Sequence, residues 1–107
     1  MVKELSPGEF MQRREAGTDM NLVDVREDWE VQLAPAPTEF IHIPMGQIVQ
    51  RIDELDASKE TVVICRSGGR SMQVARFLEQ RDFKDVANLS GGILAWSREL
   101  DPSIPTY

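Results

Sequence analysis

Short apolar runs alternate along this chain with segments in which apolar residues recur at helical spacing. Residues 61–64, Thr-Val-Val-Ile, form the most continuous β-branched run and predict a strand that is buried on both faces. The other predicted strands are residues 20–25, 39–43 and 85–89.

The predicted helices fall between these strands. Ser6-Pro7-Gly8-Glu9 combines a capping box with a proline at the first helical position, so a helix should begin there and end at Gly17. The other helical segments are residues 26–32, 48–55, 71–80 and 93–100. This alternation predicts an α/β fold with a mainly parallel central sheet that is flanked by helices on both faces.

Length and charge limit the possible functions. The chain has 107 residues, which predicts one compact domain over residues 1–107. Its formal net charge is −6, and an acidic chain lacks the basic face that nonspecific nucleic-acid binding requires, so no nucleic-acid partner is expected. No apolar stretch predicts a secretory signal or a membrane span. We therefore expect a cytoplasmic protein that does not bind a membrane.

The candidate chemistry centres on Cys65, the only cysteine in the chain. It follows the strand 61–64 and precedes a glycine-bearing loop that leads into a helix. The amides of residues 66–70, the start of that helix and the guanidinium groups of Arg66 and Arg70 would all favour a thiolate over a thiol. The alternative is a small buried apolar residue followed by a turn at Gly68 and Gly69. We favour the reactive cysteine, whose loop would stabilise a bound oxyanion or a persulfide.

Loop length separates two thiolate chemistries. Only four residues, 66–69, lie between Cys65 and Arg70, whereas cysteine-dependent phosphatases have a similar loop with five. The shorter loop forms a tighter cradle, which favours a terminal sulfur on the cysteine over a phosphoryl group. Because the chain has no second cysteine to resolve a persulfide, the sulfur must pass to another molecule.

With these features the chain resembles a single-domain rhodanese, a sulfurtransferase, over nearly its whole length. The active-site loop is the specific element, and residues 22–27, 42–45 and 89–96 resemble the two strand motifs and the final glycine-glycine-tryptophan motif of that family. The resemblance implies that Cys65 accepts sulfur, that the amides of residues 66–70 hold the persulfide, and that Arg66 or Arg70 contacts an anionic donor such as thiosulfate. The implied substrate-binding residues are Arg66, Ser67, Gly68, Gly69, Arg70 and Ser71.

Two other segments bear on the site. Residues 33–38, Leu-Ala-Pro-Ala-Pro-Thr, replace a Gly-His-Ile-Pro-Gly-Ala stretch that family members often carry, so the loop beside the active site should differ in shape. Its prolines exclude regular structure. Residues 101–107 resemble the end of rhodanese domains fused to adenylyltransferases that load sulfur onto carrier proteins. We favour a simpler role, in which Ile104 and Tyr107 pack against the surface.

The remaining polar candidates are assigned supporting roles. Asp24 and Arg26 could form an ion pair that fixes the turn after the first predicted strand, or they could shape the pocket; we favour the turn. His42, the only histidine, is expected to be a hydrogen-bonded structural residue rather than a general base. One histidine and one cysteine make no zinc site, so neither a metal nor another cofactor is expected.

The leading hypothesis is a sulfurtransferase that moves sulfane sulfur from an anionic donor such as thiosulfate, through a persulfide on Cys65, to a thiophilic acceptor. Cyanide, a thiol or a sulfur-carrier protein would serve as that acceptor. One alternative is a phosphatase or arsenate reductase that acts through the same cysteine. The other is a sulfur-relay binding module that does not catalyse a reaction.

Overall fold

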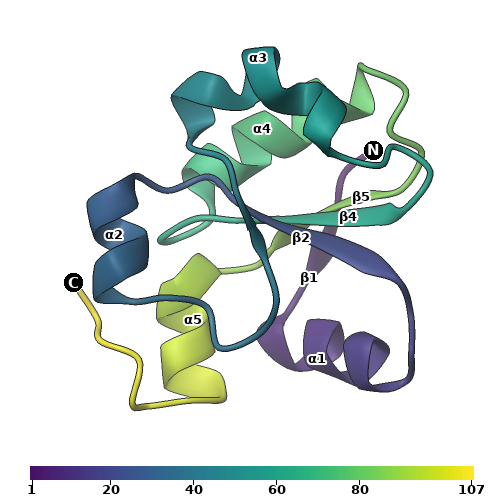
Figure 1. Cartoon of the computed structure of the whole chain (residues 1–107). Coiled ribbons are helices and arrows are strands. Elements are labelled where there is room, and N and C mark those ends of the chain that lie inside the picture. Colours follow the sequence, from purple (N-terminus) through teal and green to yellow (C-terminus); the bar gives the residue numbers. More distant parts are fainter.

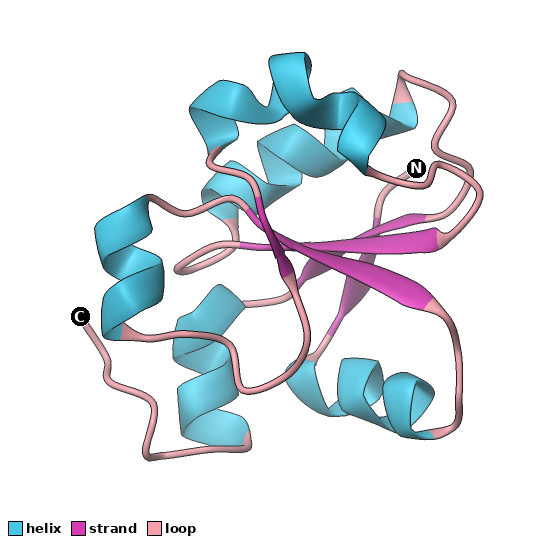
Figure 2. Cartoon of the chain, in the orientation of Figure 1, coloured by secondary structure: helices cyan, strands magenta, loops and turns pink.

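A computed structural model describes all 107 residues and contains one sheet of five strands. The strands are β1 (Lys3–Leu5), β2 (Met20–Asp24), β3 (Ile41–His42), β4 (Glu60–Ile64) and β5 (Val86–Leu89). They lie in the order β1-β5-β4-β2-β3, and every pairing is parallel. The predicted α/β fold with a parallel sheet is confirmed (Figures 1 and 2).

The strand β1 is the one that the sequence analysis does not predict. It has three residues, Lys-Glu-Leu, and it lies at the edge of the sheet beside β5. An edge strand is paired on one side only, so it tolerates charged side chains. The hydrophobic pattern on which strand prediction depends is therefore absent here.

The helices are α1 (Pro7–Glu15), α2 (Asp28–Leu33), α3 (Ile48–Arg51), α4 (Gly69–Glu79) and α5 (Gly92–Glu99). The predicted capping box is present: Ser6 Oγ accepts a hydrogen bond from the Glu9 amide at 3.1 Å, and Glu9 Oε1 accepts one from the Ser6 amide at 2.8 Å. The segment 48–55 is less regular than predicted, because 3₁₀ turns flank the four residues of α3. None of the helices combines the length and apolar character that crossing a bilayer requires.

Helices cover both faces of the sheet, as predicted. In Figure 1, α3 and α4 lie on one face and α1 and α5 on the other. Each face of the sheet has its own hydrophobic core, and consecutive residues of β4 belong to different cores. Val62 lies in the core that contains Phe10 and Trp96, whereas Val63 lies in the core that contains Leu78. Alternate side chains of a strand point to opposite faces, so a strand buried on both faces appears in the sequence as a continuous apolar run.

The carboxyl edge of the sheet positions the candidate site. The strands β2 and β4 are neighbours, with Asp24 opposite Ile64, so the loops that follow them begin side by side. The helix α2 lies beside this edge (Figure 1). It begins at Asp28, two residues later than predicted, because the backbone and side chain of Arg26 are bonded to Asp24.

Candidate active site

Cys65 lies directly after β4, at the start of the loop that leads into α4. The residue is only 1% exposed, yet its sulfur has polar neighbours. Sγ accepts a hydrogen bond from the Gly68 amide at 3.1 Å and lies 3.3 Å from the hydroxyl of Ser71. Gly68 adopts a left-handed conformation, φ 109°, which a residue with a side chain rarely adopts.

These contacts favour the thiolate. Burial alone would raise the pKa of the Cys65 thiol, but hydrogen bonds to the sulfur outweigh that effect and lower the pKa below its usual value. The donors are the hydroxyl of Ser71 and the amides of Ser67, Gly68 and Ser71. A buried cysteine surrounded by donors is a candidate nucleophile rather than a simple packing residue.

The helix α5 supports the other side of the loop. The amides of Ile93 and Leu94 donate to the carbonyl oxygens of Cys65 and Arg66, at 2.9 and 3.1 Å. This approach requires a glycine at position 92, because a Cβ there would lie 2.4 Å from the oxygen of Arg66. The loop therefore directs amides toward the sulfur while its first two carbonyls are bonded to α5.

Ser71 is held by residues that the sequence analysis does not identify. Its hydroxyl bonds Oδ1 of Asn88 on β5, and Nδ2 of Asn88 donates to the carbonyl of Gly68 at 3.2 Å and to the Glu4 carboxylate at 3.3 Å. A hydroxyl has one proton, so Ser71 can donate to only one of these groups at a time. It can donate to Asn88 when Cys65 is a thiol and to the sulfur when Cys65 is a thiolate. A buried asparagine within the apolar strand 85–89 was a signal that could have identified Asn88.

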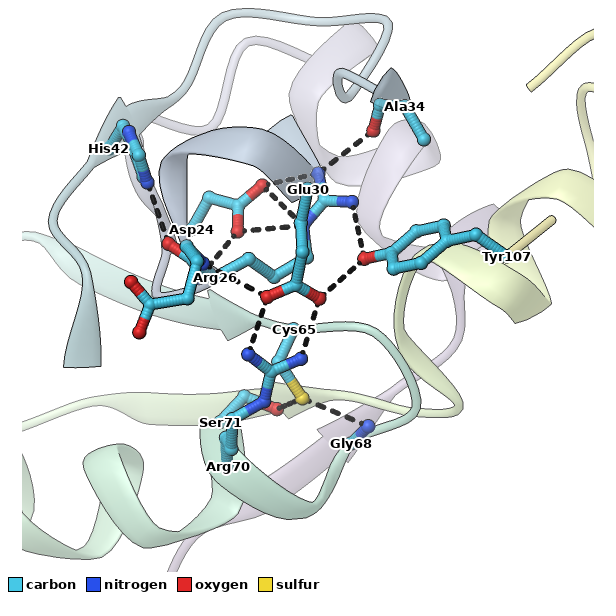
Figure 3. A network of polar contacts seen from close by, with 11 residues as sticks. Asp24, Arg26, Glu30, Ala34, His42, Cys65, Gly68, Arg70, Ser71 and Tyr107 are labelled. Carbon is cyan, nitrogen blue, oxygen red and sulfur yellow. Dashed lines mark hydrogen bonds and ion pairs between the residues drawn. The ribbon is translucent and has the colours of Figure 1, made fainter. Parts of the chain in front are cut away.

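Arg70 is fixed by a carboxylate on another helix. Its guanidinium donates to both oxygens of Glu30 on α2, at 2.7 and 2.8 Å (Figure 3). These bonds outweigh the burial of Glu30 and, with the amide of Glu27 and the hydroxyl of Tyr107, lower the pKa of Glu30 to about 2. The same carboxylate raises the pKa of Arg70. The predicted contact between Arg70 and an anionic donor stays a prediction, and the ion pair shows what orients the side chain.

Asp24 and Arg26 form a fully buried ion pair beside this site. Nη2 of Arg26 donates to Asp24 at 2.7 Å and to the carbonyl of Ala34 at 2.9 Å. Nη1 donates to the hydroxyl of Tyr107 at 3.1 Å. The pair thus fixes the turn after β2, and it also connects the proline-bearing segment to the site. The supporting role of both residues in catalysis stays a prediction.

The end of the chain reaches the site, which the sequence analysis does not foresee. Ile104 packs into the core rather than only against the surface, and it is 6% exposed. Tyr107 does more: its hydroxyl donates to Glu30 at 2.7 Å, and its backbone oxygen accepts a hydrogen bond from Arg66. Its ring lies 5.2 Å from the guanidinium carbon of Arg66 and 5.7 Å from the ring of Trp29. No local pattern in the sequence indicates these contacts.

The other predicted residues are placed as follows. Ser67 is exposed on the loop, and Gly69 is exposed at the start of α4. Nε2 of His42 lies 2.7 Å from the carbonyl of Arg26, in keeping with the structural role expected of it. The structure contains no group of three or more histidine, cysteine, aspartate or glutamate residues arranged to hold a metal ion.

Comparison with known proteins identifies the family. Residues 6–99 match the model of the Rhodanese-like domain. The chain belongs to the rhodanese-like family. A Bacillus subtilis protein named "Putative sulfurtransferase YtwF" is 44% identical over 101 residues, which are 94% of this chain and 96% of that protein. A solved structure, the rhodanese-like domain protein from Staphylococcus aureus, covers 99% of both chains with a TM-score of 0.82 and 25% identity.

A second relative is named as a sulfur carrier. The B. subtilis protein named "Putative sulfur carrier protein YrkF" is 35% identical over 96 residues, which are 90% of this chain and 51% of that protein. The resemblance inferred from the loop of this rhodanese-like domain is thus confirmed at the level of family and fold.

Proposed function

We propose that this rhodanese-like domain is a sulfurtransferase that carries sulfane sulfur on Cys65. The observation that supports the proposal is the environment of Sγ: one buried sulfur, a lowered pKa, and amide and hydroxyl donors directed at it. Donors placed where negative charge resides stabilise a thiolate and equally a persulfide anion. The name of a 44% identical relative agrees with this activity.

In the loading step, the Cys65 thiolate attacks the outer sulfur of a donor such as thiosulfate. A new bond forms between Sγ and that sulfur, the sulfur–sulfur bond of thiosulfate breaks, and sulfite leaves with the electron pair. Arg66 supports this step, because it follows Cys65 directly and no aspartate or glutamate pairs with it, whereas Arg26 and Arg70 are neutralised by Asp24 and Glu30. Its guanidinium donates to the backbone oxygen of Tyr107. A positively charged group near the loop attracts an anionic donor.

In the unloading step, a thiophilic acceptor attacks the outer sulfur of the persulfide and Cys65 leaves as a thiolate. Cyanide, a thiol or a sulfur-carrier protein would serve, and the relative named as a sulfur carrier supports a place in sulfur relay. The same donors that lower the pKa of Cys65 make it a good leaving group. A cytoplasmic location remains part of this proposal.

Intact-mass spectrometry tests the proposal directly. Incubation with thiosulfate should add the mass of one sulfur atom to the wild-type chain, and cyanide should remove it with release of thiocyanate. Cys65→Ser should abolish both the adduct and thiocyanate formation while the circular dichroism spectrum is unchanged, because the side chains are almost the same size. An adduct on the variant, or none on the wild type, would contradict the assignment. Cys65-dependent hydrolysis of an aryl phosphate would instead favour the phosphatase alternative.

A further inference from the structure

A pocket of about 510 Å³ lies beside the active-site loop. Its lining residues come from the loop, from α5 and from the end of the chain: Arg66, Leu94, Arg98, Thr106 and Tyr107. The amide of Leu94 donates to the carbonyl of Arg66, so one wall of the pocket is the part of α5 that supports the loop. The pocket therefore adjoins the site of Cys65 without containing the sulfur.

The pocket concentrates positive charge on an acidic chain. Two of its five lining residues are arginines and none is an aspartate or a glutamate, although the net charge of the chain is −6. Arg66 has no aspartate or glutamate partner, although its guanidinium donates to the backbone oxygen of Tyr107. The 69% exposed side chain of Arg98 has only a 3.5 Å contact with its neighbour Glu99. Such a weak surface contact leaves a guanidinium available to a ligand. Charge complementarity favours an anion.

The size and walls of the pocket indicate more than a small inorganic ion. A volume of about 510 Å³ lies within the range of organic ligand sites, and it greatly exceeds what thiosulfate fills. Leu94 offers an apolar surface, and the ring of Tyr107 stacks near Arg66. The hydroxyl of Tyr107 meanwhile bonds Glu30, the partner of Arg70 (Figure 3). The pocket thus suits an organic anion whose other end reaches the active-site loop.

We propose that this pocket binds the carboxylate end of an acceptor thiol, with Arg66 and Arg98 as its ligands. The inference rests on the proposed function, because an acceptor is needed only if Cys65 carries sulfur. The thiolate of the bound acceptor attacks the outer sulfur of the persulfide Cys65–S–SH. The bond from Sγ to that sulfur breaks, Cys65 leaves as a thiolate, and the acceptor departs as its persulfide. Anchoring the carboxylate raises the effective concentration of the acceptor thiolate.

Two small thiols of similar size, one anionic and one neutral, distinguish binding of the carboxylate from a general change in the reactivity of the persulfide. Wild-type protein is loaded with thiosulfate and freed of donor, and loss of the sulfur adduct is then timed with 3-mercaptopropionate, which has a carboxylate, and with neutral 2-mercaptoethanol. The ratio of the two rates is compared between variants, because a mutation that changes only the reactivity of the persulfide alters both rates equally and leaves the ratio unchanged. We expect Arg98→Ala to lower the anionic-to-neutral ratio about three- to tenfold, and Arg98→Lys to recover part of it.

Arg81→Ala is the matched control, because Arg81 is an exposed arginine that stacks on Phe77 away from the pocket. Its ratio should equal that of the wild type. Added salt should reduce the wild-type ratio toward that of Arg98→Ala, because ions screen the attraction. An unchanged ratio in Arg98→Ala would overturn the proposal, and so would an equal loss with both thiols.

A binding measurement keeps the pocket testable if the proposed function fails. Succinate, which has carboxylates but no thiol, is titrated onto unloaded protein while amide resonances are followed by NMR. Saturable shifts at Leu94, Arg98 and Thr106 that are lost in Arg98→Ala would support an anion site. Their absence would overturn it. If the wild type takes no sulfur from thiosulfate, the acceptor role falls with the proposed function, and the succinate titration alone decides whether the pocket binds carboxylates.

Discussion

Two arginine–glutamate pairs at opposite ends of β4 differ in how completely they are bonded. At the carboxyl end, the oxygens of Glu30 accept four hydrogen bonds, two from Arg70 and one each from the Glu27 amide and the Tyr107 hydroxyl. At the amino end, Glu60 pairs with Arg13 through one oxygen, while its other oxygen and Nε of Arg13 have no partner.

This difference shows where the fold requires a single geometry. Both glutamate side chains are almost buried, 4% and 8% exposed, so burial alone does not distinguish them. A fully bonded carboxylate holds its partners in one arrangement, whereas a half-bonded one permits several. The rigid network lies beside Cys65, as expected of groups that support a reactive residue (Figure 3).

The largest expected effect comes from neutralising each glutamate in turn. Glu30→Gln places an amide NH₂ against the Arg70 guanidinium whichever way the side chain is turned, and we expect a loss of about 2–3 kcal/mol in the free energy of unfolding. Glu60→Gln should cost about 1 kcal/mol or less, because its NH₂ can occupy the side that now lacks a partner. Urea unfolding measures both. Equal losses would remove the proposed contrast between the two ends.

Acid titration sharpens the same contrast. The pKa of Glu30 is about 2 in the folded chain, against an ordinary value of 4.5. Its contribution to stability is therefore complete above about pH 4.5 and is lost as the pH falls toward 2. The unfolding free energy of the wild type should fall more steeply over this window than that of Glu30→Gln, and the difference between them should shrink. Parallel curves would contradict the prediction.

A smaller effect is expected from two buried hydroxyls. Ser71 bonds Asn88 near the sulfur, and Thr61 accepts a hydrogen bond from Asn21 at 3.2 Å at the amino end. Ser71→Ala removes a donor to Sγ, so the pKa of Cys65 should rise and alkylation by iodoacetamide at neutral pH should slow about three- to tenfold. Thr61→Val should leave the pH profile of alkylation unchanged. A Ser71→Ala profile identical to that of the wild type would exclude Ser71 as a pKa-lowering group.

Local patterns in the sequence were enough to predict most of the fold. The capping box at Ser6, the apolar run of β4 and the loop after Cys65 each depend on neighbours within a few residues, and all three are present. The strand β1 was missed because its pairing with β5, rather than its own composition, makes it a strand. An edge strand of three residues carries too little hydrophobic signal to be recognised alone.

The site was only partly predictable for a different reason. Cys65 and its loop are contiguous, but Glu30 and Arg70 are separated by 40 positions, and Tyr107 and Glu30 by 77. An acidic residue on a short helix and a tyrosine in a tail are ordinary surface residues until the fold brings them together. Asn88 is the exception, because a polar residue inside a buried strand requires a partner.

The close contact between α5 and the loop determines which glycines of the site tolerate mutation. Gly69 has no neighbour within 4 Å of where a Cβ would stand, and its conformation is open to other residues, so alanine or serine should be accepted there. At Gly92 even a methyl group would collide with backbone atoms of Cys65 and Arg66. Among natural variants and in mutant libraries selected for folded protein, position 69 should therefore accept many residues, whereas position 92 should remain glycine.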